Sequence, residues 1–224
     1  MALRRWAQTF AGGRFASGMA RLNARHPWSH NDHFHAWILA NLPPRRRAAL
    51  DVGCGRGELL AALSPYFVTV QGNDIDAGMR EQATARCTGL SNVTVRDGEW
   101  TDVPGPVDAV TMIAVLHHLD TAAALHHVRR ILAPGGRFLA VGLARPVSAV
   151  DHLWDLASMV TNPMIGYVKH PWPAVGSPKP APFPVRDPTM SFDELKKTVV
   201  KIMPGAVMRH HLAFRHTILW TKPA

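Results

Sequence analysis

The sequence predicts an α/β fold built on a doubly wound, mostly parallel sheet of seven strands. From residue 48 onward, short apolar segments rich in β-branched residues alternate with helical ones, and a glycine-rich turn follows the first apolar segment. Such alternation is typical of βαβ units, whose parallel strands are joined by helical crossovers. The 224 residues fit one α/β domain, and 47% of them are hydrophobic, which is enough for a sizeable core.

An N-terminal arm and cap precede the sheet. Asn31 is a good N-cap for a helix, which Pro43 and Pro44 bring to an end. Strands are then expected at 48–53, 67–72, 92–96, 107–113 and 136–143, with helices at 56–64, 76–87 and 121–133.

The pattern changes after residue 144. We expect an added helix over 148–162, and seven prolines in 171–188 argue against regular structure there. Ser191 and Glu194 form a capping box that opens a helix to about Met203. Two strands, 206–211 and 213–221, then close the sheet. The chain 1–224 is therefore predicted to be a single domain, whose parts are an N-terminal arm and cap (1–47), a ligand-binding core (48–144), an insertion after the fifth strand (145–190), and a closing helix and hairpin (191–224).

The most informative segment is the turn after the first strand. Its glycines, Gly53, Gly55 and Gly57, stand at every second position. Glycines at this spacing let a strand turn sharply into a helix and let backbone N–H groups approach a ligand closely. A dinucleotide-binding fingerprint would place its third glycine where Glu58 stands. The third glycine comes one residue early, which argues against a pyrophosphate site.

Carboxylates follow the next two strands. Asp74 lies 21 residues after Gly53, which suits a side chain that accepts hydrogen bonds from both hydroxyls of a ribose. Asp76 is the better candidate for capping the next helix. Asp97 could accept a hydrogen bond from the exocyclic amine of an adenine walled by Trp100, although Asp97-Gly98 is also ordinary turn chemistry.

Taken together, the glycine turn and the sequence blocks that follow the next strands resemble the motifs of the class I S-adenosylmethionine-dependent methyltransferases. The resemblance covers about residues 48–143 and includes Leu116-His117-His118 after the fourth strand and Pro134-Gly135-Gly136 before the fifth. It implies a Rossmann-like fold and S-adenosylmethionine as cofactor. The implied cofactor-binding residues are Asp51, Gly53, Gly55 and Gly57 around the methionine part, Asp74 and Ile75 at the ribose, Asp97 and Gly98 at the adenine, and the backbone of Ile113 and Ala114 near the methionyl amine.

Among the candidate catalytic and acceptor-binding residues, His117 and His118 belong to the block after the fourth strand, and the others lie outside the segments that carry the resemblance. Histidine is suited to proton transfer near neutral pH, and His33 and His118 are the candidate bases, although proximity without a base would also suffice. The candidate acceptor-binding residues are Trp28, His30, His117, Trp154 and Tyr167. The 13 histidines show no metal-ligand spacing, so no metal is expected.

The charge of the chain leaves its partner open. The net charge is +9, and residues 1–31 contain no acidic residue, so the arm could touch an anionic surface. Cys54 and Cys87 do not suggest a disulfide framework, and no segment is long and apolar enough to span a bilayer. We therefore expect a cytoplasmic enzyme.

These observations favour methyl transfer to a small organic acceptor, on oxygen, nitrogen or carbon, by direct in-line displacement, with a specialised metabolite as the expected substrate. Methylation of RNA or another anionic macromolecule is the alternative, and a non-catalytic cofactor-binding partner protein is the second. The oligomeric state is left open.

Overall fold

The computed structural model describes residues 31–169 and 187–224. The described chain falls into two compact units. The larger holds residues 31–145, 187–210 and 215–224, and the smaller holds residues 146–169 and 211–214.

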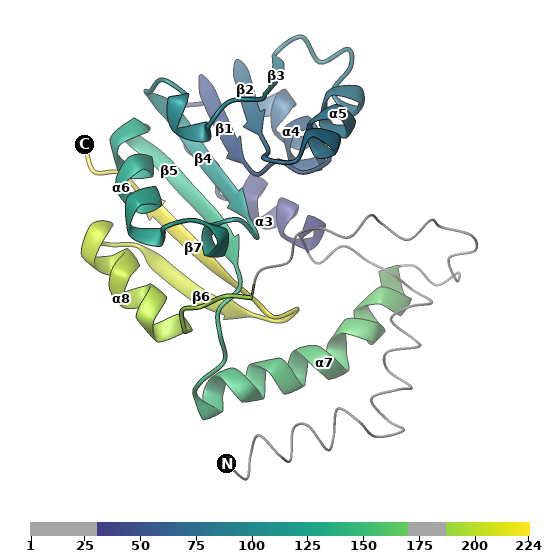
Figure 1. Ribbon diagram of the computed structural model, residues 1–224, viewed down its shortest axis with the longest axis vertical. Helices are drawn as coiled ribbons and strands as arrows, with labels where there is room; N and C mark the ends of the chain where they lie inside the picture. The colour runs from purple at the N-terminus through teal and green to yellow at the C-terminus, as the bar shows by residue number, and fades with distance from the viewer. Residues whose placement is uncertain (1–30, 170–186) are drawn as a thin grey trace. The chain divides into compact units, whose positions relative to one another are not determined.

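A seven-stranded sheet forms the centre of the fold, with the order β3-β2-β1-β4-β5-β7-β6 (Figure 1). The strands are β1 (Ala48–Val52), β2 (Thr69–Asn73), β3 (Val93–Arg96), β4 (Val107–Ile113), β5 (Leu132–Gly142), β6 (Val207–His211) and β7 (Arg215–Thr221). The first five pair in parallel, and β7 runs antiparallel to β5. The predicted doubly wound, mostly parallel sheet is confirmed. Because the strand order reverses between β1 and β4, ligands are expected at the carboxyl ends of these strands.

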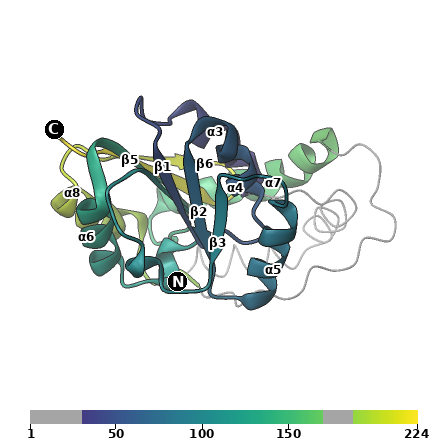
Figure 2. The same ribbon diagram turned by 90° about the horizontal axis from the view of Figure 1, so that it is seen from above.

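Helices cover both faces of the sheet (Figure 2). On one side lie η1 (Asp32–Phe34), α3 (His35–Ala40), α4 (Glu58–Leu63), η2 (Ser64–Tyr66) and α5 (Ala77–Arg86), and on the other η3 (Trp100–Asp102), η4 (Leu116–His118), α6 (Thr121–Ile131) and α8 (Phe192–Ile202). A hydrophobic core lies on each face of the sheet, and strand β4 contributes side chains to both. Val110 and Met112 pack with α6 and α8, whereas Ala109 packs with α3 and α4. Such alternation follows from the two-residue period of a strand.

The smaller unit consists of α7 (Ala149–Lys169) and the tip of the β6–β7 hairpin. The backbone N–H of Phe214 donates to Oγ of Ser158 at 3.2 Å, which joins the hairpin tip to the helix. Among the helices of the described residues, none combines the length and apolarity needed to cross a lipid bilayer.

Three local predictions differ from the structure. Asn31 makes no side-chain cap to η1, because its Oδ1 accepts a hydrogen bond from Nη2 of Arg215 at 3.1 Å. β5 begins at Leu132 and not at residue 136, because the N–H of Gly135 donates to the carbonyl of Lys222 and extends the pairing toward the end of the chain. α7 continues to Lys169, seven residues past the predicted end, with apolar residues still at helical spacing.

Candidate functional site

The glycine turn between β1 and α4 has the left-handed backbone that its sequence suggested. The φ angles are +68° at Gly53, +53° at Gly55 and +80° at Gly57. A Cβ at Gly53 would lie 2.3 Å from Cγ2 of Val115, and one at Gly57 would lie 2.9 Å from Cα of Ala83. A Cβ at Gly55 would meet nothing within 4 Å. Gly53 and Gly57 thus allow close packing, whereas Gly55 borders open space that a ligand can approach.

Replacing Gly53 with alanine is expected to lower the free energy of unfolding by about 2–4 kcal/mol, because both the left-handed φ and the Val115 side chain oppose the new methyl group. Gly55→Ala shares the left-handed φ but has no neighbour to displace, so we expect a loss of only about 1–2 kcal/mol. Urea unfolding of both variants measures the difference. Equal losses would show that contact with Val115 does not constrain the turn.

Asp74 lies against this glycine turn. Its Oδ2 accepts a hydrogen bond from the backbone N–H of Gly55 at 2.9 Å, and its Oδ1 accepts one from the N–H of Asp76 at 2.9 Å. Asp76 caps α5 by accepting from the N–H of Met79 at 2.9 Å, so its predicted capping role is confirmed. Arg80 donates to the carbonyl of Asp74 at 2.9 Å. The turn after β2 is therefore fixed by hydrogen bonds to the glycine turn and to α5, and the carboxylate of Asp74 lies beside the backbone of Gly55.

Asp51 is a buried carboxyl at the centre of the sheet. Its Oδ1 accepts a hydrogen bond from Oγ1 of Thr111 at 2.6 Å, across the β1–β4 pair in which the two residues are register partners. Burial raises the pKa of Asp51 to about 7, since the hydrogen bond from Thr111 only partly offsets the desolvation and the charge of Asp74 adds to it. The sequence pointed to Asp51 but not to Thr111, which becomes its partner only through strand register.

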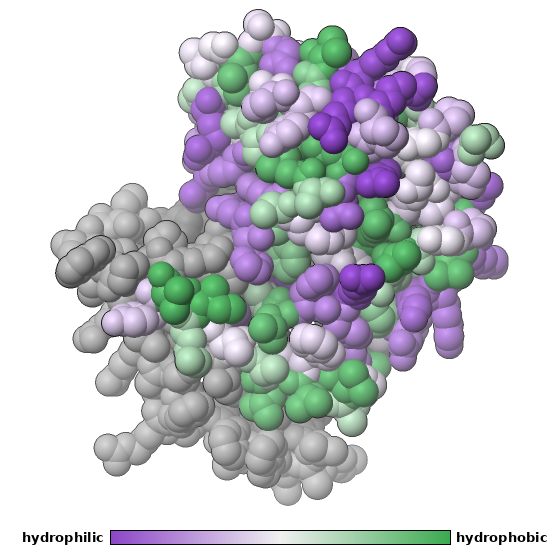
Figure 3. All heavy atoms as spheres, turned by 180° about the vertical axis from the view of Figure 1, so that it is seen from behind, coloured by the Kyte–Doolittle hydropathy of each residue, from purple (hydrophilic) through white to green (hydrophobic). Residues whose placement is uncertain are grey.

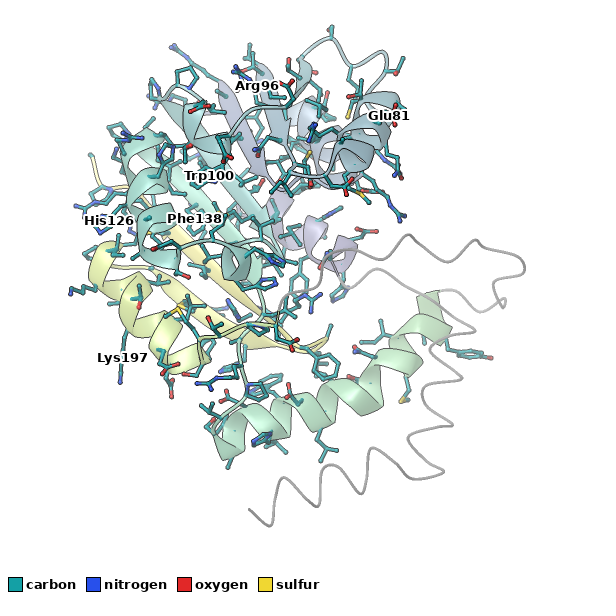
Figure 4. The ribbon with its side chains drawn as sticks, in the orientation of Figure 1. Glu81, Arg96, Trp100, His126, Phe138 and Lys197 are labelled. Carbon is teal, nitrogen blue, oxygen red and sulfur yellow. The ribbon has the colours of Figure 1, made fainter. Side chains whose placement is uncertain are left out.

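The residues after β3 are open to solvent at Asp97 and Gly98. The carbonyl of Gly98 accepts from Nδ2 of Asn73 at 3.3 Å, which ties the ends of β2 and β3 together. Within the described residues, the buried Oδ1 of Asn73 has no hydrogen-bond partner. Trp100, labelled in Figure 4, is buried in the core with its ring edge-on to His127 at 4.7 Å. The expectation that Trp100 would wall an adenine is therefore wrong, because the ring packs against α6.

The segment after β4 brings polar groups to the same edge of the sheet. Ala114 has a left-handed φ of +58°, and its N–H donates to the carbonyl of Val141 at 2.8 Å. Ile113 and Ala114 are both half-buried. His117 is half-buried and His118 is exposed, and their ring centroids lie 4.1 Å apart.

A small cavity of about 30 Å³ lies at the carboxyl ends of β4 and β5. Its lining includes His117, Thr121, Gly142 and His216. His216 is buried and pairs with Gly142 in the β5–β7 register. A Cβ at Gly142 would lie 2.7 Å from Nε2 of His216, so this imidazole needs a glycine beside it. The sequence did not single out His216, because strand pairing, not chain position, brings it to this edge.

The other predicted site residues lie on other elements or outside the described residues. His33 is exposed, and its ring meets that of Phe34 edge-on at 5.4 Å. Trp154 and Tyr167 lie on α7 in the smaller unit. Trp28 and His30 lie outside the described residues. Ile75 is exposed beside Asp74, and its carbonyl accepts from Arg80 at 3.0 Å. Within 31–169 and 187–224, no group of three His, Cys, Asp or Glu side chains is placed to hold a metal ion.

Known proteins match this chain in sequence and in fold. A family model described as a methyltransferase domain matches residues 50–140. Uncharacterized methyltransferase Rv0089 of Mycobacterium tuberculosis is 34% identical over 203 residues, which cover 88% of this chain and 98% of that protein. Trans-aconitate 2-methyltransferase of Methylobacterium radiotolerans is 32% identical over 140 residues, 61% of this chain and 53% of that protein.

A solved structure extends the likeness to the whole fold. The magnesium protoporphyrin IX methyltransferase of Synechocystis PCC 6803, solved with bound SAH, has a TM-score of 0.56 and 19% identity, and the match covers 99% of this chain and 94% of that one. The fold, the family model and the relative Rv0089, which matches over 203 residues, all agree with the resemblance carried by the glycine turn and the carboxylates at the strand ends. The chain belongs to the class I S-adenosylmethionine-dependent methyltransferases, and S-adenosylmethionine is its cofactor.

Proposed function

We propose that this methyltransferase acts on a small organic acceptor, at oxygen, nitrogen or carbon, and that a specialised metabolite is the substrate. The observation that carries this proposal is the distribution of charge. All 16 Asp and Glu residues lie in the described ranges, together with 18 of the 25 Lys and Arg residues. The described part of the chain is thus nearly neutral, whereas a surface that binds RNA is expected to be strongly basic.

The residues at the strand ends fit the cofactor. Gly55 borders open space, Asp74 presents a carboxylate next to it, and Asn73 has a buried oxygen with no partner in the described residues. We assign the ribose hydroxyls to Asp74 and the adenine amine to Asp97. Asp51 and the glycine turn would hold the methionine part, with the backbone of Ile113 and Ala114 near its amine.

Bound S-adenosylmethionine supplies a methyl group on a sulfonium, which a nucleophile displaces in line. The protein has to hold the acceptor atom about 3–3.5 Å from the methyl carbon and keep water out. We infer that the acceptor binds near His117. Trp28, His30, Trp154 and Tyr167 stay candidate acceptor contacts on the sequence alone.

His33 and His118 are the candidate bases for an acceptor that arrives protonated. If one of them removes this proton, its replacement by alanine is expected to lower kcat by about 10²–10⁴ and to remove the acidic limb of the pH–rate profile. If neither His33→Ala nor His118→Ala lowers kcat by more than about threefold, positioning alone drives the transfer.

The test of this function is a transfer assay with methyl-labelled S-adenosylmethionine and a metabolite extract. We expect label in the small-molecule fraction and release of S-adenosylhomocysteine. Label found only in RNA would overturn the proposal in favour of the nucleic-acid alternative. Cofactor binding without any release of S-adenosylhomocysteine would favour a non-catalytic partner protein. We further propose that residues 1–224 act as one methyltransferase domain in the cytoplasm.

A further inference from the structure

The cavity at the carboxyl ends of β4 and β5 has an uncharged lining that can form hydrogen bonds. Its polar side chains are two imidazoles and two hydroxyls, those of His117, His216, Thr121 and Thr189. The other described residues around it are glycine, proline and apolar residues, with no Asp, Glu, Lys or Arg among them. The lining thus differs from the outer surface, where strongly hydrophilic side chains are common (Figure 3). The volume of about 30 Å³ holds about two or three water-sized atoms, since each needs about 10–15 Å³ of such space.

The fold fixes the imidazole of His216 against this cavity. His216 is only 2% exposed, and its partner in the β5–β7 register is Gly142. A Cβ at Gly142 would lie 2.7 Å from Nε2 and 2.9 Å from Cε1 of His216. The ring of Phe192 meets the imidazole edge-on, with the ring centroids 5.8 Å apart. Glycine in a strand often marks a place where another group approaches the backbone closely. The position of this imidazole therefore depends on Gly142 and Phe192.

The two hydroxyls also stand on segments that hydrogen bonds hold in place. Thr121 is the first residue of α6, which Asp120 caps. Thr189 lies just before α8, in a segment tied to the chain after β5, because the N–H of Arg145 donates to the carbonyl of Met190 at 2.8 Å. Ligand sites typically combine a mostly apolar lining with a few well-placed polar groups, which fix the orientation of the ligand. The cavity has this composition on a small scale.

We propose that this cavity binds an oxygen group of the methyl acceptor, a hydroxyl or a carboxyl, and that His216 is a specificity-determining residue for it. The inference rests on the proposed function, in which the acceptor binds near His117. Imidazole and hydroxyl groups can both donate a hydrogen bond to oxygen. A cationic amine would meet no carboxylate in this lining, so the loss of its hydration would not be offset. A hydroxyl and a carboxyl present the same kind of oxygen, and the test separates them.

The first test needs no methyl transfer. The NMR signals of the ring nitrogens of His117 and His216 are followed in the full chain as methanol, acetate or methylammonium is added at constant pH and ionic strength. These probes carry a hydroxyl, a carboxylate and a cationic amine on a single methyl group. We expect a saturable shift with methanol or acetate, which identifies the oxygen group, and none with methylammonium. In His216→Phe the shift at His117 should be lost. A saturable shift with methylammonium, or none with methanol and acetate, would overturn the proposal.

The second test is the transfer assay with labelled S-adenosylmethionine and a metabolite extract, at dilutions where the rate is proportional to kcat/KM. We expect His216→Phe to lower this rate at least about tenfold and His216→Gln, which keeps a hydrogen-bonding group, to stay within about threefold of the wild type. Gly142→Ala should resemble His216→Phe, because the new Cβ displaces the imidazole. The matched control is His210→Phe, since the ring of His210 lies 3.7 Å from that of Phe192 but does not line the cavity. It should transfer as the wild type does.

The variants also separate a role in acceptor binding from a structural one. Isothermal titration calorimetry should give the wild-type affinity for S-adenosylmethionine in all of them. Wild-type transfer by His216→Phe, or an equal loss in His210→Phe, would overturn the proposal. A labelled product whose unmethylated form carries neither a hydroxyl nor a carboxyl would do so as well. If the wild type transfers no methyl group, the proposed function fails, whereas the NMR titration still decides whether the cavity binds an oxygen group.

Discussion

Asp74→Ala is expected to weaken S-adenosylmethionine binding at least about 100-fold. Two hydrogen bonds from ribose hydroxyls to a carboxylate contribute about 1.5–3 kcal/mol each. The variant also removes the acceptor that Oδ2 provides for the N–H of Gly55, so the glycine turn loses its tie to β2. Isothermal titration calorimetry with S-adenosylmethionine measures the affinity directly.

Asp76→Ala is the matched control for this prediction. It removes the N-cap of α5, two residues along the same turn, and should cost about 1 kcal/mol of stability. Its carboxylate holds the N–H of Met79 and is not assigned to the ribose, so the affinity should stay within about threefold of the wild type. Wild-type affinity in Asp74→Ala, or an equal loss in Asp76→Ala, would contradict the assignment of the ribose to Asp74.

The parts of the site that could be predicted from the sequence are those set by local chain geometry. Three glycines at every second position predict a turn with a left-handed backbone, which glycine adopts readily. The structure has a positive φ at all three glycines. Asp76 stands three residues before Met79, so its capping role depends only on the start of one helix. Asp74 and Asp97 both follow strands of a parallel sheet, whose carboxyl ends share one edge.

The parts that could not be predicted depend on register between distant strands. Thr111 is the partner of Asp51 because β4 pairs with β1 in one register, and a shift of one residue would turn its side chain to the other face. His216 reaches the cavity because β7 pairs antiparallel with β5 opposite Gly142. The burial of Trp100 also depends on tertiary packing. Its ring lies against His127 of α6, and the sequence alone does not predict that η3 and α6 come together.

α7 shows a different limit of sequence reasoning. Its helical period was visible, but the period does not say which of the two faces points inward. The aromatic residues Trp154 and Tyr167 were therefore expected on the acceptor side. In the structure Tyr167 is exposed and Trp154 is half-buried, while the buried residues Ser158 and Asn162 are polar. An apolar stripe usually marks the core, but on α7 the apolar residues Leu153 and Val168 are exposed.

Asp51 is expected to make both the free energy of unfolding and the affinity for the cofactor depend on pH. Burial raises the pKa of this carboxyl to about 7 in the folded protein, from 3.8 for an exposed side chain. Between these values the unfolded chain releases a proton that the folded protein keeps, so stability falls as the pH rises from about 4 to about 7. Asp51→Asn should lack this contribution, which amounts to about 4 kcal/mol over the whole titration and to about 2.6 kcal/mol between pH 5 and pH 8. Urea unfolding of both proteins at pH 5 and pH 8 measures it, and parallel pH dependence would show that Asp51 ionises normally.

Cofactor binding should have the opposite pH dependence. The sulfonium and ammonium groups of S-adenosylmethionine are cationic, so a carboxyl near the methionine part binds them better when it is ionised. We expect the affinity of the wild type to rise about tenfold from pH 6 to pH 8, because the ionised fraction of a carboxyl with a pKa of about 7 rises about tenfold over this range. The affinity of Asp51→Asn should not change with pH over this range. Thr111→Val removes the hydrogen bond that lowers the pKa of Asp51, so it should move this rise to higher pH. A rise that persists in Asp51→Asn would place the titrating group elsewhere in the site.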